Sequence, residues 1–212
     1  MTLKTRIKMC GMTQAEDVVY AQHLGVDALG FIFYNQSRRA ISVEQAKAIL
    51  VEVDQRLSRS LVSDLVAVFV NPERSLVAHV MATLPIDYLQ FHGEESPEFC
   101  NQFAIPYIKA IPAESVEKIQ YGLEKYATAA AILLDTPAGQ QRGGTGQLFD
   151  WEMIPKCHKP MILAGGLTVD NVWQAIRTCS PSVVDVCSGI ESSPGIKDHT
   201  KMQQFVEAVR GI

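Results

Sequence analysis

The sequence predicts a single α/β domain, residues 1–212, in which eight strand–helix units close into a parallel barrel. The main observation is that short apolar runs alternate with amphipathic helical patterns, as in βαβ units around a parallel sheet. Eight such units in 212 residues take about 26 residues each, which fits a (β/α)8 barrel. The alternative is a doubly wound open sheet, but the Gly-rich fingerprint usual after its first strand is missing from Lys8–Thr13.

The expected elements follow this alternation along the chain. Apolar runs rich in β-forming residues predict strands at Thr5–Met9, Ala28–Phe33, Leu65–Val70, Tyr88–Phe91, Tyr107–Ile111, Ala131–Leu134, Met161–Leu163 and Val183–Val186. Amphipathic patterns predict helices at Thr13–Leu24, Ser42–Leu57, Pro72–Leu84, Ser96–Phe103, Ala113–Tyr126, Thr168–Thr178 and Lys197–Val209. The link between Leu134 and Met161 is irregular, because a Gly-rich loop precedes only a short helix candidate near Phe149–Ile154.

Composition narrows the classes of function. Hydrophobic residues make up 47% and charged residues 20%, which is typical of a folded globular protein rather than a disordered chain. A net charge of −4 argues against a nucleic-acid partner but allows an anionic small molecule. The five cysteines are odd in number and form no CxxC pair, so we expect reduced thiols. The sequence shows no secretory signal and no apolar stretch of ~20 residues, so we expect a soluble cytoplasmic protein without a membrane partner.

Several polar side chains fall on strand faces that the barrel would turn inward. Alternate residues of a strand share a face, which places Lys8 with Cys10, and Gln90 with His92. Asp185 shares its face with Cys187 in the same way. One interpretation is a structural ion pair between Lys8 and an aspartate, because buried charges need partners. The other is an active site at the carboxyl ends of the strands, where barrel enzymes carry their chemistry.

Two strand-end residues are candidates for proton transfer. Cys10 faces the start of a helix, whose dipole can lower a thiol pKa, although most free cysteines are buried and inert. Asp135 ends the sixth strand and is either catalytic or a turn former before Thr136 and Pro137. We expect the other four cysteines to be structural. No metal site is expected, because Cys157-His158 is the only neighbouring Cys–His pair and nothing completes a zinc site.

Glycine-rich loops follow the last three strands. Gly143–Gly146 is read as a flexible loop or a lid; a P-loop is rejected because Thr145 stands where the lysine belongs. Ala164–Leu167 and Ser188-Gly189 follow the seventh and eighth strands, where barrels of this type commonly bind phosphate; the alternative is ordinary turn glycines. Beyond the second strand, Arg38-Arg39 could hold a carboxylate or phosphate, or be solvated loop charges.

Taken in order and spacing, these segments resemble the phosphoribosylanthranilate isomerase family over essentially the whole chain. The segments that carry the resemblance are Lys8–Thr13, Asp27–Phe33, Leu89–Gly93, Leu133–Asp135, Gly143–Gly146, Phe149–Trp151, Leu163–Leu167, Asp185–Glu191 and Ser193–Asp198. The resemblance implies a (β/α)8 barrel without cofactor or metal. It also implies an Amadori rearrangement of N-(5′-phosphoribosyl)anthranilate to the 1-deoxyribulose-5-phosphate ketone, in tryptophan biosynthesis.

The resemblance also implies roles for individual residues. It makes Cys10 the general base and Asp135 the general acid, and it places Arg39 on the anthranilate carboxylate, with Pro frequent in the family where this chain has Arg38. Asp185 would orient a ribose hydroxyl and His92 would belong to the substrate site. The implied phosphate-binding residues are Gly144, Gly165, Gly166, Ser188 and Gly189. We expect a monomer or a weak homodimer.

Other functions share part of this pattern. A sugar-phosphate epimerase or an indole-glycerol-phosphate synthase would share the phosphate loops, but it would need a metal-ligand set or a catalytic Lys/Glu pair that the sequence does not assemble. A non-enzymatic sugar-phosphate sensor would need the loops without a poised Cys10 and Asp135. A turnover assay that follows substrate fluorescence distinguishes the three.

Overall fold

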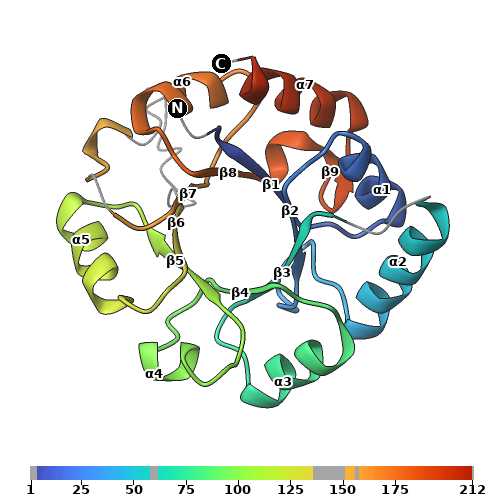
Figure 1. The fold of residues 1–212 in the computed structure, drawn as a ribbon, viewed down its shortest axis with the longest axis horizontal. Coiled ribbons are helices and arrows are strands. Elements are labelled where there is room, and N and C mark those ends of the chain that lie inside the picture. The colour runs from blue at the N-terminus through green and yellow to red at the C-terminus, as the bar shows by residue number, and fades with distance from the viewer. Residues whose placement is uncertain (1–3, 58–61, 136–150, 156–157, 212) are drawn as a thin grey trace.

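The barrel predicted from the sequence is confirmed in the computed structural model, which describes residues 4–57, 62–135, 151–155 and 158–211. Eight parallel strands close in sequence order, so that the first strand pairs with the last, and helices ring the outside (Figure 1). The strands are β1 (Arg6–Cys10), β2 (Ala28–Ile32), β3 (Asp64–Phe69), β4 (Tyr88–Phe91), β5 (Tyr107–Pro112), β6 (Ala131–Asp135), β7 (Met161–Leu163) and β8 (Val183–Val186).

Apart from α4, the helices lie close to the predicted ranges. They are α1 (Ala15–His23), α2 (Val43–Arg56), α3 (Arg74–Thr83), α4 (Pro97–Cys100), α5 (Val116–Lys125), α6 (Val172–Cys179) and α7 (His199–Arg210). Local sequence explains the start of α2, where Ser42 accepts a hydrogen bond from the Gln45 amide and the Gln45 side chain accepts one from the Ser42 amide. This capping box satisfies backbone groups that a helix end leaves unpaired.

Two local predictions need correction. The helix expected at Ser96–Phe103 is only α4, because the chain turns after Cys100. The helical spacing of Phe99 and Phe103 serves a different purpose: both rings pack on Phe91, with centroids 5.8 and 6.0 Å away.

The second difference is an antiparallel hairpin after β8, which the sequence did not predict. It follows a short 3-10 turn, η2 (Ser188–Ile190), and consists of β9 (Glu191–Ser193) and β10 (Ile196–Lys197).

Strand parity divides the core into two layers. Alternate strand residues point inward and fill the barrel, while the others pack beneath the helices. The inner cluster is small and contains Cys10, Val66, Val68, Ile108, Ala110, Leu133, Ile162 and Ala164. Cys10 is therefore part of the barrel lining, on the face that the sequence predicted.

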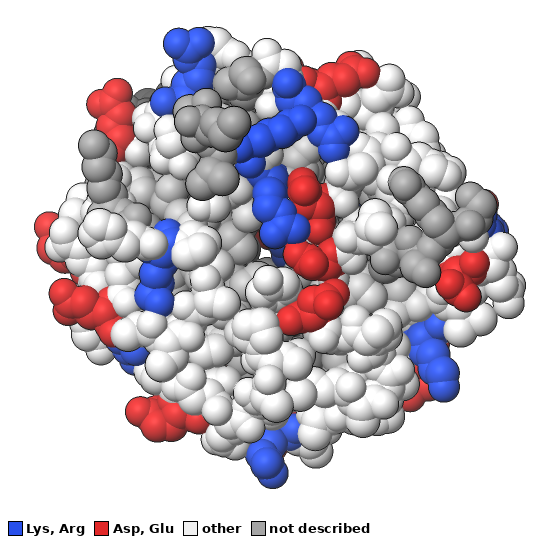
Figure 2. Space-filling model, in the orientation of Figure 1, with Lys and Arg blue, Asp and Glu red and all other residues white. Residues whose placement is uncertain are grey.

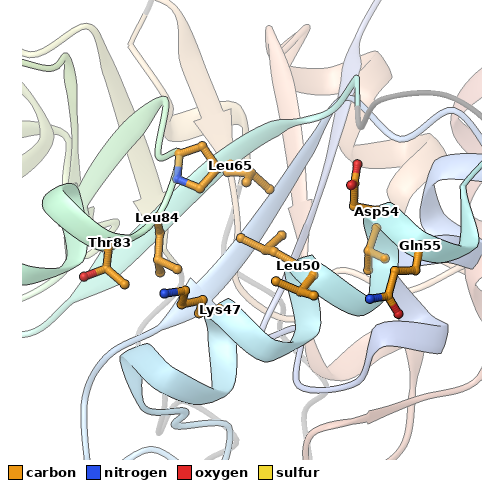
Figure 3. Close-up of a pocket in the computed structure, with 10 residues that line it drawn as sticks. Lys47, Leu50, Asp54, Gln55, Leu65, Thr83 and Leu84 are labelled. Atoms are coloured by element: carbon orange, nitrogen blue, oxygen red, sulfur yellow. The ribbon is translucent and has the colours of Figure 1, made fainter.

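Two surface features lie at the amino ends of the strands. Arg6 at the start of β1 donates a hydrogen bond to Asp64 at the start of β3 at 2.8 Å, and it lies 3.6 Å from Asp27, just before β2. Figure 2 shows basic and acidic side chains meeting at the centre of a barrel end. A groove between α2 and α3 is lined by Leu50, Leu65 and Leu84, among others (Figure 3). Because chemistry in such barrels lies at the carboxyl ends, we assign neither feature to the active site.

A buried ion pair fixes the loop after β4. Lys109 lies in β5 between two inward-facing residues and points to the helix side, where its ammonium lies 2.9 Å from Glu95 Oε2. Both side chains are 2% exposed. The ammonium also donates to the carbonyls of Phe91 and Gly93, and Glu95 accepts the amides of Gly93 and Asn71. The pair thereby satisfies the backbone groups of this turn.

We expect Lys109→Met to lower the free energy of unfolding by about 3–5 kcal/mol, because it leaves the buried Glu95 carboxylate without its cation. Urea denaturation measures this. The matched control is Lys118→Met, which removes an exposed partner of Glu114 one helical turn away and should change stability by at most about 0.5 kcal/mol. Equal effects of the two substitutions would contradict this account of the buried pair.

Candidate active site

Polar groups gather at the carboxyl ends of strands on both sides of the barrel mouth. Cys10 ends β1, His92 follows β4, Asp135 ends β6, and Asp185 lies in β8. These are the residues that the sequence predicted for the site. The structure joins them in two clusters, one across the β1–β8 seam and one across β4 and β6.

The first cluster contains the ion pair expected as one interpretation of Lys8. Lys8 and Asp185 are partners in the β1–β8 register, and Nζ lies 2.8 Å from Oδ2. Burial raises the pKa of Asp185 to about 7, and the Lys8 ammonium opposes this rise. Burial disfavours the charge of Lys8, but the negative charges of Asp185 and Cys10 outweigh it and raise its pKa. Asp185 Oδ1 is buried with no hydrogen-bond partner among the described residues, so it can accept one from a ligand.

Cys10 lies in an environment that favours its thiolate. The Cys187 thiol donates a hydrogen bond to the Cys10 sulfur, which is the strongest influence lowering the Cys10 pKa. Burial opposes this, but the charges of Lys8 and Lys197 add to it, and the pKa falls well below its usual value. The lowered pKa agrees with the sequence-based hypothesis, but its main cause is a neighbouring cysteine that the sequence had classed as structural.

The second cluster orients the Asp135 carboxyl group. His92 Nε2 lies 2.9 Å from Asp135 Oδ2, and the other ring nitrogen of His92 lies 3.2 Å from the Gln90 amide nitrogen. Both His92 and Asp135 are about one third exposed, so a ligand in the mouth can reach them. The contact holds Oδ2 of Asp135 in place. Among the described residues, none donates a hydrogen bond to Oδ1, so this oxygen can meet a ligand.

Arg39 is held by two residues that the sequence analysis did not single out. Its Nε and Nη2 donate to the two oxygens of Glu191 at 2.7 and 2.6 Å, and Lys197 Nζ donates to the same carboxylate at 3.0 Å. This side-on pairing leaves the end-on edge of the guanidinium for a ligand. By contrast, Arg38 is exposed to solvent.

Glu191 and Lys197 belong to the hairpin β9–β10, which explains why they were missed. The two strands are three and two residues long, too short for a periodic signal. One signal was available: an acidic and a basic residue flank a Ser-Pro-Gly turn, which brings them together. Lys197 also donates to the carbonyls of Cys10 at 2.7 Å and Cys187 at 3.2 Å, so the hairpin fastens the ends of β1 and β8.

The predicted phosphate loops after β7 and β8 lie against each other. Gly165 and Gly166 have φ angles of 84° and 64°, which L side chains rarely adopt. A Cβ at Gly189 would come within 2.0 Å of the Leu167 carbonyl oxygen, so glycine is needed for this close approach. Ser188 is exposed at the start of η2. Gly144, the remaining predicted phosphate residue, lies outside the described residues.

The fold and this arrangement define a (β/α)8 barrel with titratable side chains and adjoining glycine-rich loops at one end. A family model described as N-(5'phosphoribosyl)anthranilate (PRA) isomerase matches residues 7–208. The N-(5'-phosphoribosyl)anthranilate isomerase of Legionella pneumophila (strain Paris) is 52% identical over 209 residues, covering 98% of each chain. The chain therefore belongs to the N-(5′-phosphoribosyl)anthranilate isomerase family.

Solved structures agree with this assignment. Phosphoribosyl anthranilate isomerase from Thermotoga maritima matches with a TM-score of 0.84 at 34% identity, covering 98% of this chain and 100% of that one. A phosphoribosyl anthranilate isomerase in complex with reduced 1-(o-carboxyphenylamino)-1-deoxyribulose 5-phosphate matches with a TM-score of 0.81 at 33% identity and the same coverage. Within the part of the chain described here, no helix is long and apolar enough to cross a membrane.

We expect iodoacetamide near neutral pH to label Cys10 faster than Cys100 or Cys179, because only thiolates react and burial raises the pKa of those two to about 12 and 11. The Cys10 rate should already be near its plateau at a pH where the other two rates still climb tenfold per pH unit. Peptide mass spectrometry measures each site. A Cys10 rate that rises in parallel with the other two rates would refute the thiolate assignment.

Proposed function

We propose that this chain, an isomerase by family, rearranges N-(5′-phosphoribosyl)anthranilate with Cys10 as general base and Asp135 as general acid. The observation that supports this most directly is the environment of Cys10, where a thiol donor and two ammonium groups stabilise a thiolate at the barrel mouth. Asp135 ends β6 with its carboxyl group accessible, so a substrate between the two residues meets a base and an acid.

The reaction needs one proton delivered and one removed. Asp135 protonates the furanose ring oxygen, the C1′–O bond breaks, and the anilino nitrogen supplies the electron pair that forms the iminium. The iminium makes the C2′ hydrogen acidic, and the Cys10 thiolate removes it to give an enolamine. Tautomerisation yields the 1-deoxyribulose-5-phosphate ketone. The iminium is the electron sink, so this scheme requires neither cofactor nor metal.

Anchors at the two ends of the substrate place the reacting carbons between base and acid. We assign the phosphate to the adjoining loops with Gly165, Gly166, Ser188 and Gly189, since positive-φ glycines let backbone N–H groups approach an anion closely. The free edge of Arg39 receives the anthranilate carboxylate.

Two further contacts complete the proposed substrate site. The unpartnered Oδ1 of Asp185 accepts a ribose hydroxyl, and His92 lies at the substrate beside Asp135. The complex of a solved relative with reduced 1-(o-carboxyphenylamino)-1-deoxyribulose 5-phosphate supports a small anionic partner for this site. A single domain over residues 1–212, a monomer or weak homodimer, and a cytoplasmic location stay predictions.

We expect Cys10→Ser to lower kcat by at least ~10²-fold with KM little changed, because a serine hydroxyl is a far weaker base at neutral pH. Asp135→Asn should act similarly, since it removes the proton donor and keeps most contacts. Loss of substrate fluorescence reports turnover, and Cys179→Ser controls for cysteine replacement away from the mouth. A folded Cys10→Ser variant with near wild-type kcat would eliminate Cys10 as the base. Absence of turnover by the unaltered chain would favour a sugar-phosphate sensor.

We expect Arg39→Ala to lower kcat/KM by on the order of a hundredfold, because a charge-assisted contact of about 2–3 kcal/mol is lost. Glu191 keeps Lys197 as its partner, so the hairpin should stay in place. Arg38→Ala is the matched control and should be nearly neutral. If Arg38→Ala proves the more damaging of the two, the carboxylate assignment belongs to Arg38.

A further inference from the structure

Cys10 and Cys187 form a close pair of thiols across the seam where the barrel closes. The β1–β8 register pairs Lys8 with Asp185 and Met9 with Val186, so the next residue on each side is a cysteine. Both face the barrel interior, because they keep the parity of Lys8 and Asp185. Neighbouring strands lie about 4.8 Å apart, within the ~4.4–6.8 Å Cα separation that a disulfide spans. Both side chains belong to the same inner cluster, and each thiol is close enough to shift the pKa of the other.

The surroundings give the two sulfurs different roles. The Cys10 pKa is lowered, whereas the interaction with the Cys10 side chain, burial and the negative charge of the Cys10 thiolate raise the pKa of Cys187 strongly. Lys197 Nζ lies 3.9 Å from Cys187 Sγ, and Arg39 adds a second positive charge nearby. When the charge on Cys10 is removed, these cations remain to favour a thiolate at Cys187. One cysteine is thus prepared to react first and the other to react second.

We propose that Cys10 and Cys187 are a reversible oxidation site, at which a hydroperoxide oxidises Cys10 and Cys187 then closes an intramolecular disulfide. Nothing in the isomerisation uses Cys187 in this way. An active-site thiolate without a neighbouring thiol can proceed from sulfenic to sulfinic acid, which is not reduced by ordinary thiols. The second cysteine makes the modification reversible.

The chemistry balances in two steps with hydrogen peroxide. The Cys10 thiolate attacks one peroxide oxygen, the O–O bond breaks, and the released hydroxide takes a proton to leave as water. The product is a sulfenic acid. The Cys187 sulfur then attacks the Cys10 sulfur, the S–O bond breaks, an S–S bond forms, and a second water leaves with the Cys187 proton. Two thiols lose two electrons and two protons, and one peroxide becomes two waters.

The disulfide itself follows from the position of the thiols, whereas its effect on turnover rests on the proposed role of Cys10. The experiment therefore reads the bond and the activity separately. The reduced full-length chain is treated with hydrogen peroxide and quenched with N-ethylmaleimide under denaturing conditions. It is then digested with trypsin without reduction. Mass spectrometry maps the cysteines, and a parallel sample is assayed for turnover before and after dithiothreitol.

We expect a single dominant cross-linked product that joins peptide Met9–Arg38 to peptide Thr178–Lys197. Turnover should fall together with this product, by about the ~10²-fold of Cys10→Ser, and dithiothreitol should restore it. Cys179 lies in the same tryptic peptide as Cys187, so Cys179→Ser is the matched control and must leave the cross-link unchanged. Cys187→Ser must abolish it and let Cys10 be trapped by dimedone as a sulfenic acid.

Three results would overturn the proposal. Cys10 could pass to sulfinic acid in the unaltered chain without a cross-link, the cross-link could survive in Cys187→Ser, or it could vanish in Cys179→Ser. A cross-link at Cys10–Cys187 with no effect on measured turnover supports the oxidation site and instead contradicts the role of Cys10 as base. The two proposals therefore fail on different readouts.

Discussion

The Lys8–Asp185 ion pair at the β1–β8 seam is the interaction on which the rest of the site depends. Two charges buried inside a barrel are tolerated only when they neutralise each other, and this requirement selects one register between the first and last strands. A slip of one residue would turn one charge toward the helix layer and leave the other unpaired. The same register places Cys10 beside Cys187. Stability of the seam and reactivity of the site therefore have one cause.

Charge at the mouth is balanced group by group. Lys8, Lys197 and Arg39 face Asp185, Glu191 and the Cys10 thiolate. Because Cys10 and Asp185 both draw on the Lys8 ammonium, a negative charge on one disfavours the other: burial raises the pKa of Asp185 to about 7 against the pull of Lys8, and the negative charge of Cys10 adds to this rise. Near neutral pH, proton movement at the thiol is therefore coupled to the group that we assign to the ribose hydroxyl.

Sequence periodicity could predict most of the frame and the positions of the strand-end residues. Parity put Lys8, Cys10 and Asp185 on one inner face, and the structure confirms the barrel and the Lys8–Asp185 pair. The pairing across β1 and β8 joins residues 177 apart, so parity alone could not choose which aspartate meets Lys8. The influence of Cys187 on the Cys10 pKa was missed for the same reason, since the two residues come together only once the barrel closes.

The hairpin after β8 illustrates a different limit of sequence reasoning. Glu191 and Lys197 are buried charged residues in strands too short to show a hydrophobic periodicity. What they do depends on the distant residues that they contact, which no local sequence pattern reveals. The Lys197 ammonium donates hydrogen bonds to three groups: the carbonyl of Cys10 at the end of β1, the carbonyl of Cys187 after β8, and the Glu191 carboxylate that holds Arg39.

In the mechanism that we propose, the catalytic strength of Cys10 and its vulnerability to oxidants are coupled. A thiol serves as a base only if its pKa is low, and a low pKa also makes it the first target of an oxidant. Cys10 is already buried, and burial raises its pKa, so it is the neighbouring groups that keep the thiol reactive. The oxidation site that we propose meets both demands, since the Cys187 thiol directly after β8 helps to lower the pKa of Cys10 while the pair is reduced and lies near Cys10 when that residue is oxidised.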